Sequence, residues 1–162
     1  MNRAEKHLCF GWWYLAFWVT IGLVLEGLHG FKVGWYLDVG NDTRRLMFTL
    51  AHAHGSFLAL LNIVLALTAR GRADFTIRPS VSIAIIWAAL LLPGGFLLGG
   101  IVTYGGDPGL GVWLVPVGAL LLLYSVVRTA VEMSKLKKSA SETVIPVAVK
   151  EVPAVATKKR RR

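Results

Sequence analysis

Four ionisable side chains lie near the ends of two long apolar segments, where a charge is costly if those segments cross a membrane. Glu26 and His29 close the first segment, and His52 and His54 lie just inside the second. Glu26 and His29 are three residues apart, so on a helix they project from nearly the same face. In helical bundles this E-x-x-H spacing lets a carboxylate and an imidazole share a metal ion. The spacing therefore makes these four residues the candidate metal ligands.

Three kinds of chemistry fit this set of side chains, and one structural role does too. Two or three imidazoles with a carboxylate suit a transition metal such as Zn, Fe, Cu or Mn. A b-type haem would be held between His29 and either His52 or His54, because haem iron accepts axial histidines. A proton relay or substrate site would be centred on Glu26. In the structural alternative, these groups hydrogen-bond one another and staple the two helices together.

His52 and His54 are two residues apart, which separates them by roughly 160° around a helix axis. One of them should therefore face the first helix, and the other should face the third or fourth. Thr49 and Ser56 lie about one turn from His52 and are placed to orient its ring. Asn62 lies deeper, where it either lines a polar path or bonds across helices.

Apolar segments surround these residues and define the fold class. The chain has 162 residues, is 55% hydrophobic and has a mean hydropathy of +0.59. Its charge-free segments are 8–25, 46–69, 79–106 and 108–127. A helix that crosses the hydrocarbon needs about 20 apolar residues, so each segment is long enough. We therefore predict an all-α integral membrane four-helix bundle in residues 1–138, with helices at about 10–29, 46–68, 80–103 and 109–134.

The positions of lysine and arginine indicate the orientation of the bundle. Of the 18 basic residues, all but Lys32, Arg44 and Arg45 lie in the N-terminal end, the second loop or the C-terminal end. Both termini should then face the cytoplasm, in a multi-pass protein of the cytoplasmic (inner) membrane, with the Glu/His site near the outer surface. Residues 139–162 should form a disordered basic tail. Anionic lipid, and not nucleic acid, is the expected partner of that tail.

The first loop, FKVGWYLDVGNDTRR, is too polar to cross the membrane and too aromatic for a free loop. It should therefore lie along the outer surface. Asn41, Asp42 or Thr43 is placed to cap the second helix. Arg44 and Arg45 would then lie at the level of the lipid headgroups and contact them or another anion.

Proline and glycine interrupt the last two helices. Residues 93–95, Pro-Gly-Gly, should break the middle of the third helix, and Pro116 should weaken the fourth at a similar depth. Paired breaks are a feature of transporter sites, and they also occur where neighbouring helices absorb a kink. Gly95 and Gly99 form a G-x-x-x-G step, which permits close helix contact within the bundle or between copies. Turn residues at 106–109, Gly-Asp-Pro-Gly, should connect the two helices.

The stretch 26–55, together with LPGGFLLGG and GGDPGLGVWLVPVGALLLL further on, resembles uncharacterised small four-helix membrane proteins of bacteria. That resemblance covers most of residues 10–130 and implies the fold but no activity. Residues 41–62 are also similar to hydroxylaminobenzene mutases, which are small membrane enzymes. The matching positions are Asn41, Arg44 or Arg45, His52, Gly55 and Asn62. The rest departs from that family: it has no counterpart of the later Asn-rich helix, and Glu26 and His29 are not explained.

The sequence thus favours an accessory membrane subunit of a redox or transport complex that holds a metal or a haem at the Glu/His site. Its expected partners are the lipid bilayer, further copies of the chain, or a larger membrane complex. The alternatives are an isomerase-like membrane enzyme, and a structural or assembly protein whose Glu/His cluster only joins the first two helices.

Overall fold

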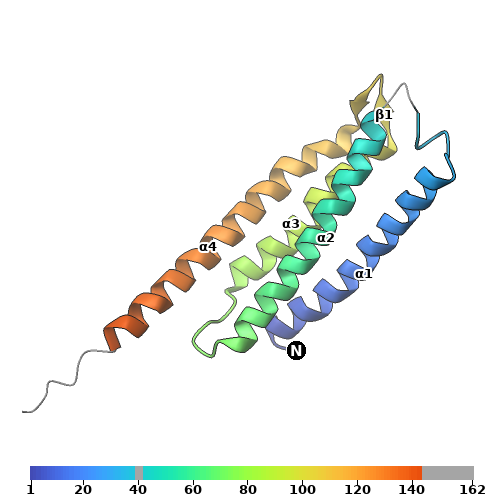
Figure 1. The fold of residues 1–162 in the computed structure, drawn as a ribbon. Helices are drawn as coiled ribbons and strands as arrows, with labels where there is room; N and C mark the ends of the chain where they lie inside the picture. The colour runs from blue at the N-terminus through green and yellow to red at the C-terminus, as the bar shows by residue number, and fades with distance from the viewer. Residues whose placement is uncertain (39–41, 144–162) are drawn as a thin grey trace, which may run out of the picture.

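The computed structural model describes residues 1–38 and 42–143, with side chains as far as residue 136. Within these residues the chain forms four long helices, α1 (Arg3–Gly30), α2 (Asp42–Gly71), α3 (Pro79–Ile101) and α4 (Leu114–Thr143). Between α3 and α4 lie an antiparallel hairpin of β1 (Thr103–Tyr104) and β2 (Asp107–Pro108), and the 3-10 helix η1 (Leu110–Trp113). Successive long helices run antiparallel and form an elongated bundle (Figure 1).

All four long helices are of sufficient length and apolarity to cross a membrane, so the predicted all-α fold with four such helices is confirmed. Some helix bounds differ from the prediction. α1 begins at Arg3 and not near residue 10, because Asn2 and Glu5 form a capping box: the Asn2 side chain accepts from the Glu5 amide at 2.8 Å, and the Glu5 carboxylate accepts from the Asn2 amide at 3.0 Å. The tail predicted over 139–162 is helical as far as Thr143, and the rest of it lies outside the described residues.

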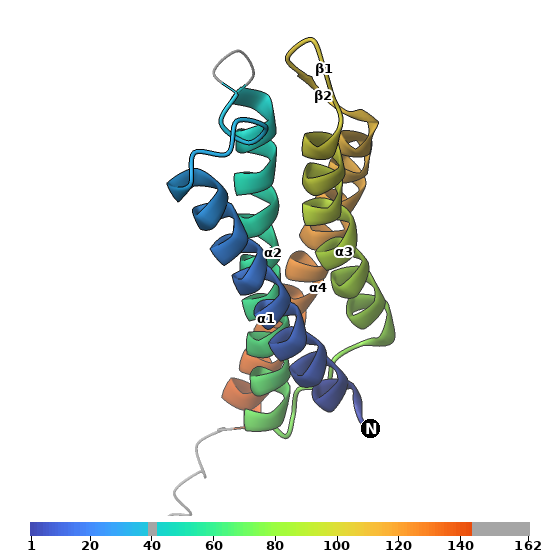
Figure 2. The same cartoon turned by 90° about the vertical axis from the view of Figure 1, so that its right-hand side faces the viewer.

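The helices pack in chain order, α1 on α2, α2 on α3 and α3 on α4. In the most apolar stretch of each helix, 44% of the residues of α2 and of α3 are buried, against 11% of those of α1 and of α4. α2 and α3 therefore form the inside of the bundle, and α1 and α4 turn most of their apolar surface outward (Figure 2). Side chains of all four helices meet around Leu58, Ala89 and Leu92, where Phe10 comes from α1 and Val115 from α4.

Glycines let α1 and α2 approach closely. The Trp18 indole, which is 2% exposed, lies over Gly55, where a Cβ would be 2.1 Å from the indole Cε2. Nearer the N-terminus of α1, a Cβ on Gly11 would be 2.6 Å from Cγ1 of Ile63. Neither position accepts a larger residue without movement of its neighbours. Small residues at such contacts are typical of helices that associate in membranes.

α3 runs unbroken through Pro93, so the predicted break at residues 93–95 is wrong. A proline inside a helix has no amide hydrogen, which leaves the carbonyl four residues earlier, that of Ala89, without its usual partner. The hydroxyl of Tyr14 on α1 donates a hydrogen bond to that carbonyl. The neighbouring helix thus replaces the missing bond, as membrane helices with internal proline require. Pro116 lies in the first turn of α4, a position where proline is tolerated in a helix.

The predicted close contact at Gly95 and Gly99 is made inside the bundle. A Cβ on Gly95 would be 2.9 Å from Cγ2 of Val115, and a Cβ on Gly99 would be 3.5 Å from Cβ of Val112. This face of α3 therefore packs against η1 and the start of α4.

The hairpin between α3 and α4 turns at Gly105 and Gly106, whose φ angles are +55° and +102°. Two-residue hairpin turns of this kind need positive φ at both central positions, which glycine adopts without strain. The predicted turn at 106–109 is therefore shifted, because residues 107–108 form β2. Thr43 donates to the Gly106 carbonyl and so ties the hairpin to the start of α2. Asn41, also considered as a cap of that helix, lies outside the described residues.

Tyr14→Phe should destabilise the bundle by about 1–3 kcal/mol, because it leaves the Ala89 carbonyl buried without a partner. Pro93→Ala restores an amide that bonds this carbonyl within α3, so Tyr14→Phe should cost much less in the Pro93→Ala background. Unfolding in mixed detergent micelles, followed by circular dichroism, measures the free energy of all four proteins of this cycle. An equal cost of Tyr14→Phe in both backgrounds would show that the hydroxyl does not replace the missing amide.

Candidate functional site

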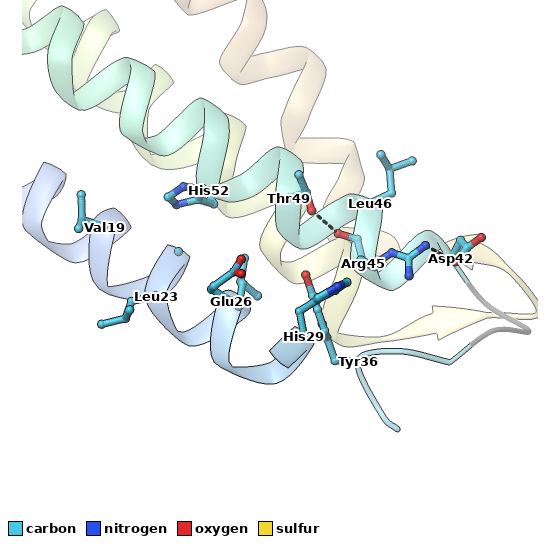
Figure 3. Close-up of a pocket in the computed structure, with 12 residues that line it drawn as sticks. Val19, Leu23, Glu26, His29, Tyr36, Asp42, Arg45, Leu46, Thr49 and His52 are labelled. Carbon is cyan, nitrogen blue, oxygen red and sulfur yellow. Dashed lines mark hydrogen bonds and ion pairs between the residues drawn. The ribbon is translucent and has the colours of Figure 1, made fainter. Parts of the chain in front are cut away.

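An open groove of about 1040 Å³ lies between the end of α1 and the start of α2 (Figure 3). Three of the four predicted metal ligands, Glu26, His29 and His52, line it together with Arg45, a predicted anion contact. The other lining residues are Val19, Gly22, Leu23, Leu25, Tyr36, Asp42, Leu46 and Thr49. The groove therefore combines ionisable groups with apolar walls, at the end of the bundle that carries the first loop.

Glu26 and His29 reach the groove from the last turns of α1, which stays helical as far as Gly30 (Figure 3). Their spacing of three residues brings both to the same side of the helix, as predicted. Both side chains are exposed. Neither forms a hydrogen bond or an ion pair with another described residue. They are therefore available to a ligand in the groove.

His52 faces α1, and a main-chain group fixes its ring. Its Nδ1 lies 2.8 Å from the carbonyl oxygen of Trp18. A carbonyl accepts and does not donate, so Nδ1 carries a hydrogen, and in the neutral ring Nε2 is the nitrogen with the lone pair. The ring lies against Gly22, where a Cβ would be 2.4 Å from the ring Cε1 and 2.9 Å from Nε2. His52 therefore has a fixed orientation with one nitrogen able to accept a hydrogen bond or bind a metal.

His54 lies on the opposite side of α2, outside the groove. Its Nδ1 is 2.8 Å from the Leu50 carbonyl of the same helix, and its ring contacts the Phe96 ring of α3 with centroids 5.0 Å apart. The predicted divergence of the two histidines is confirmed: His52 faces α1 and His54 faces α3.

The four predicted metal ligands are consequently not gathered at one point. The described part of the chain holds no group of three or more His, Cys, Asp or Glu side chains placed to hold a metal ion. Glu26, His29 and His52 share the groove, and His54 is turned away from it. A metal ion held by all four residues together does not fit this arrangement.

Arg44 binds other parts of the protein. Its guanidinium donates to the carbonyls of Trp35 at 2.9 Å and Gly100 at 3.2 Å, and to the Thr103 hydroxyl at 3.3 Å. It also stacks on the Trp35 ring, with Cζ 4.6 Å from the ring centroid. The last carbonyls of α3 lack helical partners, and a positive charge is favourable there. Arg44 therefore ties the first loop to the end of α3, and this structural role was not predicted.

Arg45 extends on the groove side of α2, where its Nη2 lies 2.7 Å from the Asp42 carboxylate. The two side chains are 41% and 72% exposed, so the pair adds little stability. An anion or headgroup contact of Arg45 stays a prediction. Thr49 donates to the Arg45 carbonyl at 2.9 Å and does not orient His52. Ser56 Oγ, the other hydroxyl considered for that role, is buried without a hydrogen-bond partner in the described chain.

A second polar cluster joins three helices at the other end of the bundle. His7 of α1 is fully buried, with Nδ1 2.7 Å from Oδ1 of Asn62 and Nε2 2.8 Å from Oγ of Ser82. The Asn62 amide donates to the Leu58 carbonyl at 2.8 Å, which assigns the amide oxygen to His7. Nδ1 of His7 is then the donor, and Nε2 accepts from Ser82. Asn62 therefore bonds across helices, which was one of the two roles predicted for it.

His7 was missed in the sequence because charged neighbours suggested that it lies outside the bundle. The signal that would have found it is the face it shares with Gly11, Tyr14 and Trp18, at intervals of three and four residues. Each of these four residues contacts α2 or α3. A polar residue that continues such a buried face is itself buried.

Four helices of membrane-spanning length, with a polar groove at one end and a buried polar cluster at the other, fit a multi-pass helical membrane protein. No family model, curated protein or solved structure matches the chain. The resemblances noted in its sequence stay predictions.

His7→Ala should destabilise the protein by about 1–3 kcal/mol, because it leaves buried polar atoms of Asn62 and Ser82 without a partner. Asn62→Ala should cost a similar amount, and the double variant should cost less than the sum, since both remove one shared bond. Denaturant unfolding in detergent measures these free energies. Cys9→Ala, an exposed position on the same helix, is the control and should change stability by less than about 0.5 kcal/mol. Strictly additive costs would contradict the shared bond.

Proposed function

We propose that the protein is a multi-pass accessory subunit of the inner membrane that binds a b-type haem in its outer groove, where His52 would hold the haem. The observation that carries this proposal is the fixed ring of His52. This residue lines the groove, and its Nδ1 donates to the Trp18 carbonyl at 2.8 Å. Histidines that bind metals almost always donate their other ring N–H in this way. Such a bond fixes both the tautomer and the direction of the ring.

Haem suits these residues better than a bare metal ion. A haem iron takes one or two axial protein ligands, whereas protein-held zinc takes three or four, and the described residues include no group of three. The groove, at about 1040 Å³, is at the upper end of ligand-pocket volumes. Leu23 and Leu46 offer apolar contacts to a macrocycle. Arg45 at the same groove offers a guanidinium to its carboxylates.

Glu26 and His29 would complete the site. His29 lines the same groove from α1 and is the second histidine that would hold the haem. Glu26 is the carboxylate available to accept a hydrogen bond or a proton beside the ligand. A bound haem would supply one-electron transfer, and the chain would supply its orientation and its apolar surroundings.

The alternative of a purely structural role also has an observation in its favour. The His52–Trp18 bond links α2 to α1, which is what a staple requires. Glu26 and His29 take no part in that link, since their side chains bond to no described residue. The isomerase-like alternative has less support, because the matching residues Gly55 and Asn62 are occupied by packing against Trp18 and bonding to His7.

Protein purified in mild detergent from haem-supplied cells should show a Soret band, and His52→Ala should abolish it or reduce it at least tenfold. His54→Ala is the matched control, because this histidine lies on the same helix but faces Phe96. It should keep the band. His29→Ala should shift the spectrum towards that of a haem with one protein axial ligand.

A colourless protein that also binds no added haem would contradict the proposal. So would equal losses in His52→Ala and His54→Ala, because His54 does not line the groove. The free energy of unfolding of the haem-free variants distinguishes a purely structural role of these residues from a role in binding. A staple alone predicts that His52→Ala lowers stability and that Glu26→Gln and His29→Ala change nothing in either assay.

A further inference from the structure

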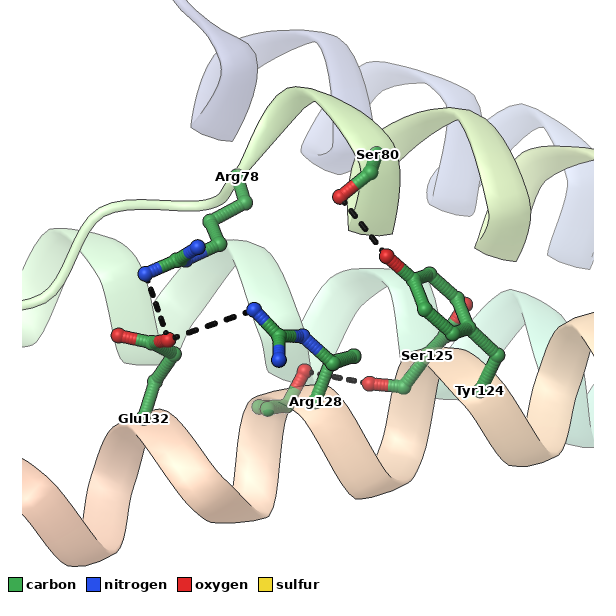
Figure 4. Close-up of polar contacts among 7 residues, drawn as sticks. Arg78, Ser80, Tyr124, Ser125, Arg128 and Glu132 are labelled. Carbon is green, nitrogen blue, oxygen red and sulfur yellow. Dashed lines mark hydrogen bonds and ion pairs between the residues drawn. The ribbon is translucent and has the colours of Figure 1, made fainter.

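A third polar cluster lies between the start of α3 and the middle of α4, at the end of the bundle opposite the groove (Figure 4). Tyr124, Arg128 and Glu132 follow at intervals of four residues and form one stripe along α4. Arg78 and Ser80 face this stripe from the start of α3.

Two guanidinium groups share one carboxylate in this cluster. Nη2 of Arg78 lies 2.8 Å from Oε1 of Glu132, and Nη2 of Arg128 lies 3.9 Å from the same oxygen. The cluster therefore carries a net positive charge. Its arginine side chains are 47% and 36% exposed. Two buried atoms of the cluster, Nε of Arg128 and Oε1 of Glu132, form no hydrogen bond in the described chain, although Oε1 makes both ion pairs. The Glu132 carboxylate is too small to accept from all N–H groups of Arg78 and Arg128, so some of these donors are left for another acceptor.

The position of the cluster along α3 and α4 indicates its depth in a membrane. α3 has 23 residues, which span about 34 Å at 1.5 Å per residue, and the hydrocarbon core is about 30 Å thick. Arg78 at the start of α3 is therefore at one edge of the hydrocarbon. The Tyr124 hydroxyl donates to Ser80 Oγ at 3.0 Å and so brings α4 to the same level. Lipid phosphate groups lie at this depth, where tyrosine is also enriched.

We propose that this cluster is a binding site for the phosphate group of an anionic phospholipid. Arg78 and Arg128 donate to the phosphate oxygens, and Glu132 holds the two guanidinium groups in place between α3 and α4. This site is independent of the haem groove.

Arg72 provides a matched control on the same surface. It is 40% exposed, like the arginines of the cluster, but it pairs with Asp74 alone, through bonds of 3.1 and 2.7 Å. Those hydrogen bonds hold the pKa of the Asp74 carboxyl below its ordinary value. The Arg72–Asp74 pair is therefore neutral at physiological pH, and Arg72→Gln changes the net charge of this surface as much as Arg128→Gln does.

The test uses the full chain in detergent, titrated with phosphatidylglycerol or phosphatidylcholine, with bound lipid counted by native mass spectrometry and stability followed by thermal unfolding. The wild type should bind phosphatidylglycerol in preference and gain thermal stability from it. Arg128→Gln should weaken that binding several-fold, and Arg78→Gln with Arg128→Gln should weaken it by roughly tenfold or more. Arg72→Gln should leave it within about twofold.

Arg128→Lys keeps the charge and removes the planar fork, so it should lose part of the preference while it folds normally. If Arg128→Lys behaves as the wild type and Arg72→Gln weakens binding as much as Arg128→Gln, general surface charge explains the preference and the site is refuted. Equal binding of the two lipids refutes it as well. Displacement of phosphatidylglycerol by millimolar inorganic phosphate would show that the ligand is a soluble anion and not a lipid.

Discussion

Hydrogen bonds from side chains to main-chain carbonyls of neighbouring helices hold this bundle in register. Tyr14 of α1 donates to Ala89 of α3, His52 of α2 donates to Trp18 of α1, and Arg44 of α2 closes the end of α3. In lipid, helices gain little by covering apolar surface, so association depends on close packing and on bonds of this kind. Each bond also fixes how a helix is rotated about its axis, because the donor must face its carbonyl. The groove depends on that rotation.

The glycines of α1 and α2 follow from the same constraint. Trp18 of α1 occupies the space left by Gly55 of α2, and His52 of α2 occupies the space left by Gly22 of α1. A large side chain on each helix thus fits a glycine on the other, which sets the register of the pair along their axes. Glu26 lies one turn beyond Gly22 on α1, so this register places it in the groove that His52 lines. The packing contact and the candidate site are therefore parts of one interface.

Features that depend on neighbouring residues in the sequence were predicted, whereas features that depend on contacts between remote segments were not. Helix number comes from apolar length, and the divergence of His52 and His54 comes from helix period, so both were predicted from local sequence. The break at Pro93 was wrongly predicted, because the hydroxyl that repairs it belongs to Tyr14, on a helix remote in the sequence. His7 was missed for a similar reason: its burial depends on partners that only the packed bundle supplies.

Glu26 and His29 bear most directly on whether the groove has a function beyond packing. Trp18, Gly22 and His52 would hold α1 to α2 without them, since the bond and the close contacts involve none of their atoms. A purely structural contact between α1 and α2 gains nothing from these two side chains, because they are exposed and form no bond to the described residues. Two such groups, unbonded within the described chain and beside an imidazole of fixed tautomer, favour a ligand over a staple. The stability of the bundle explains His52 alone, whereas the proposed ligand in the groove would account for all three side chains.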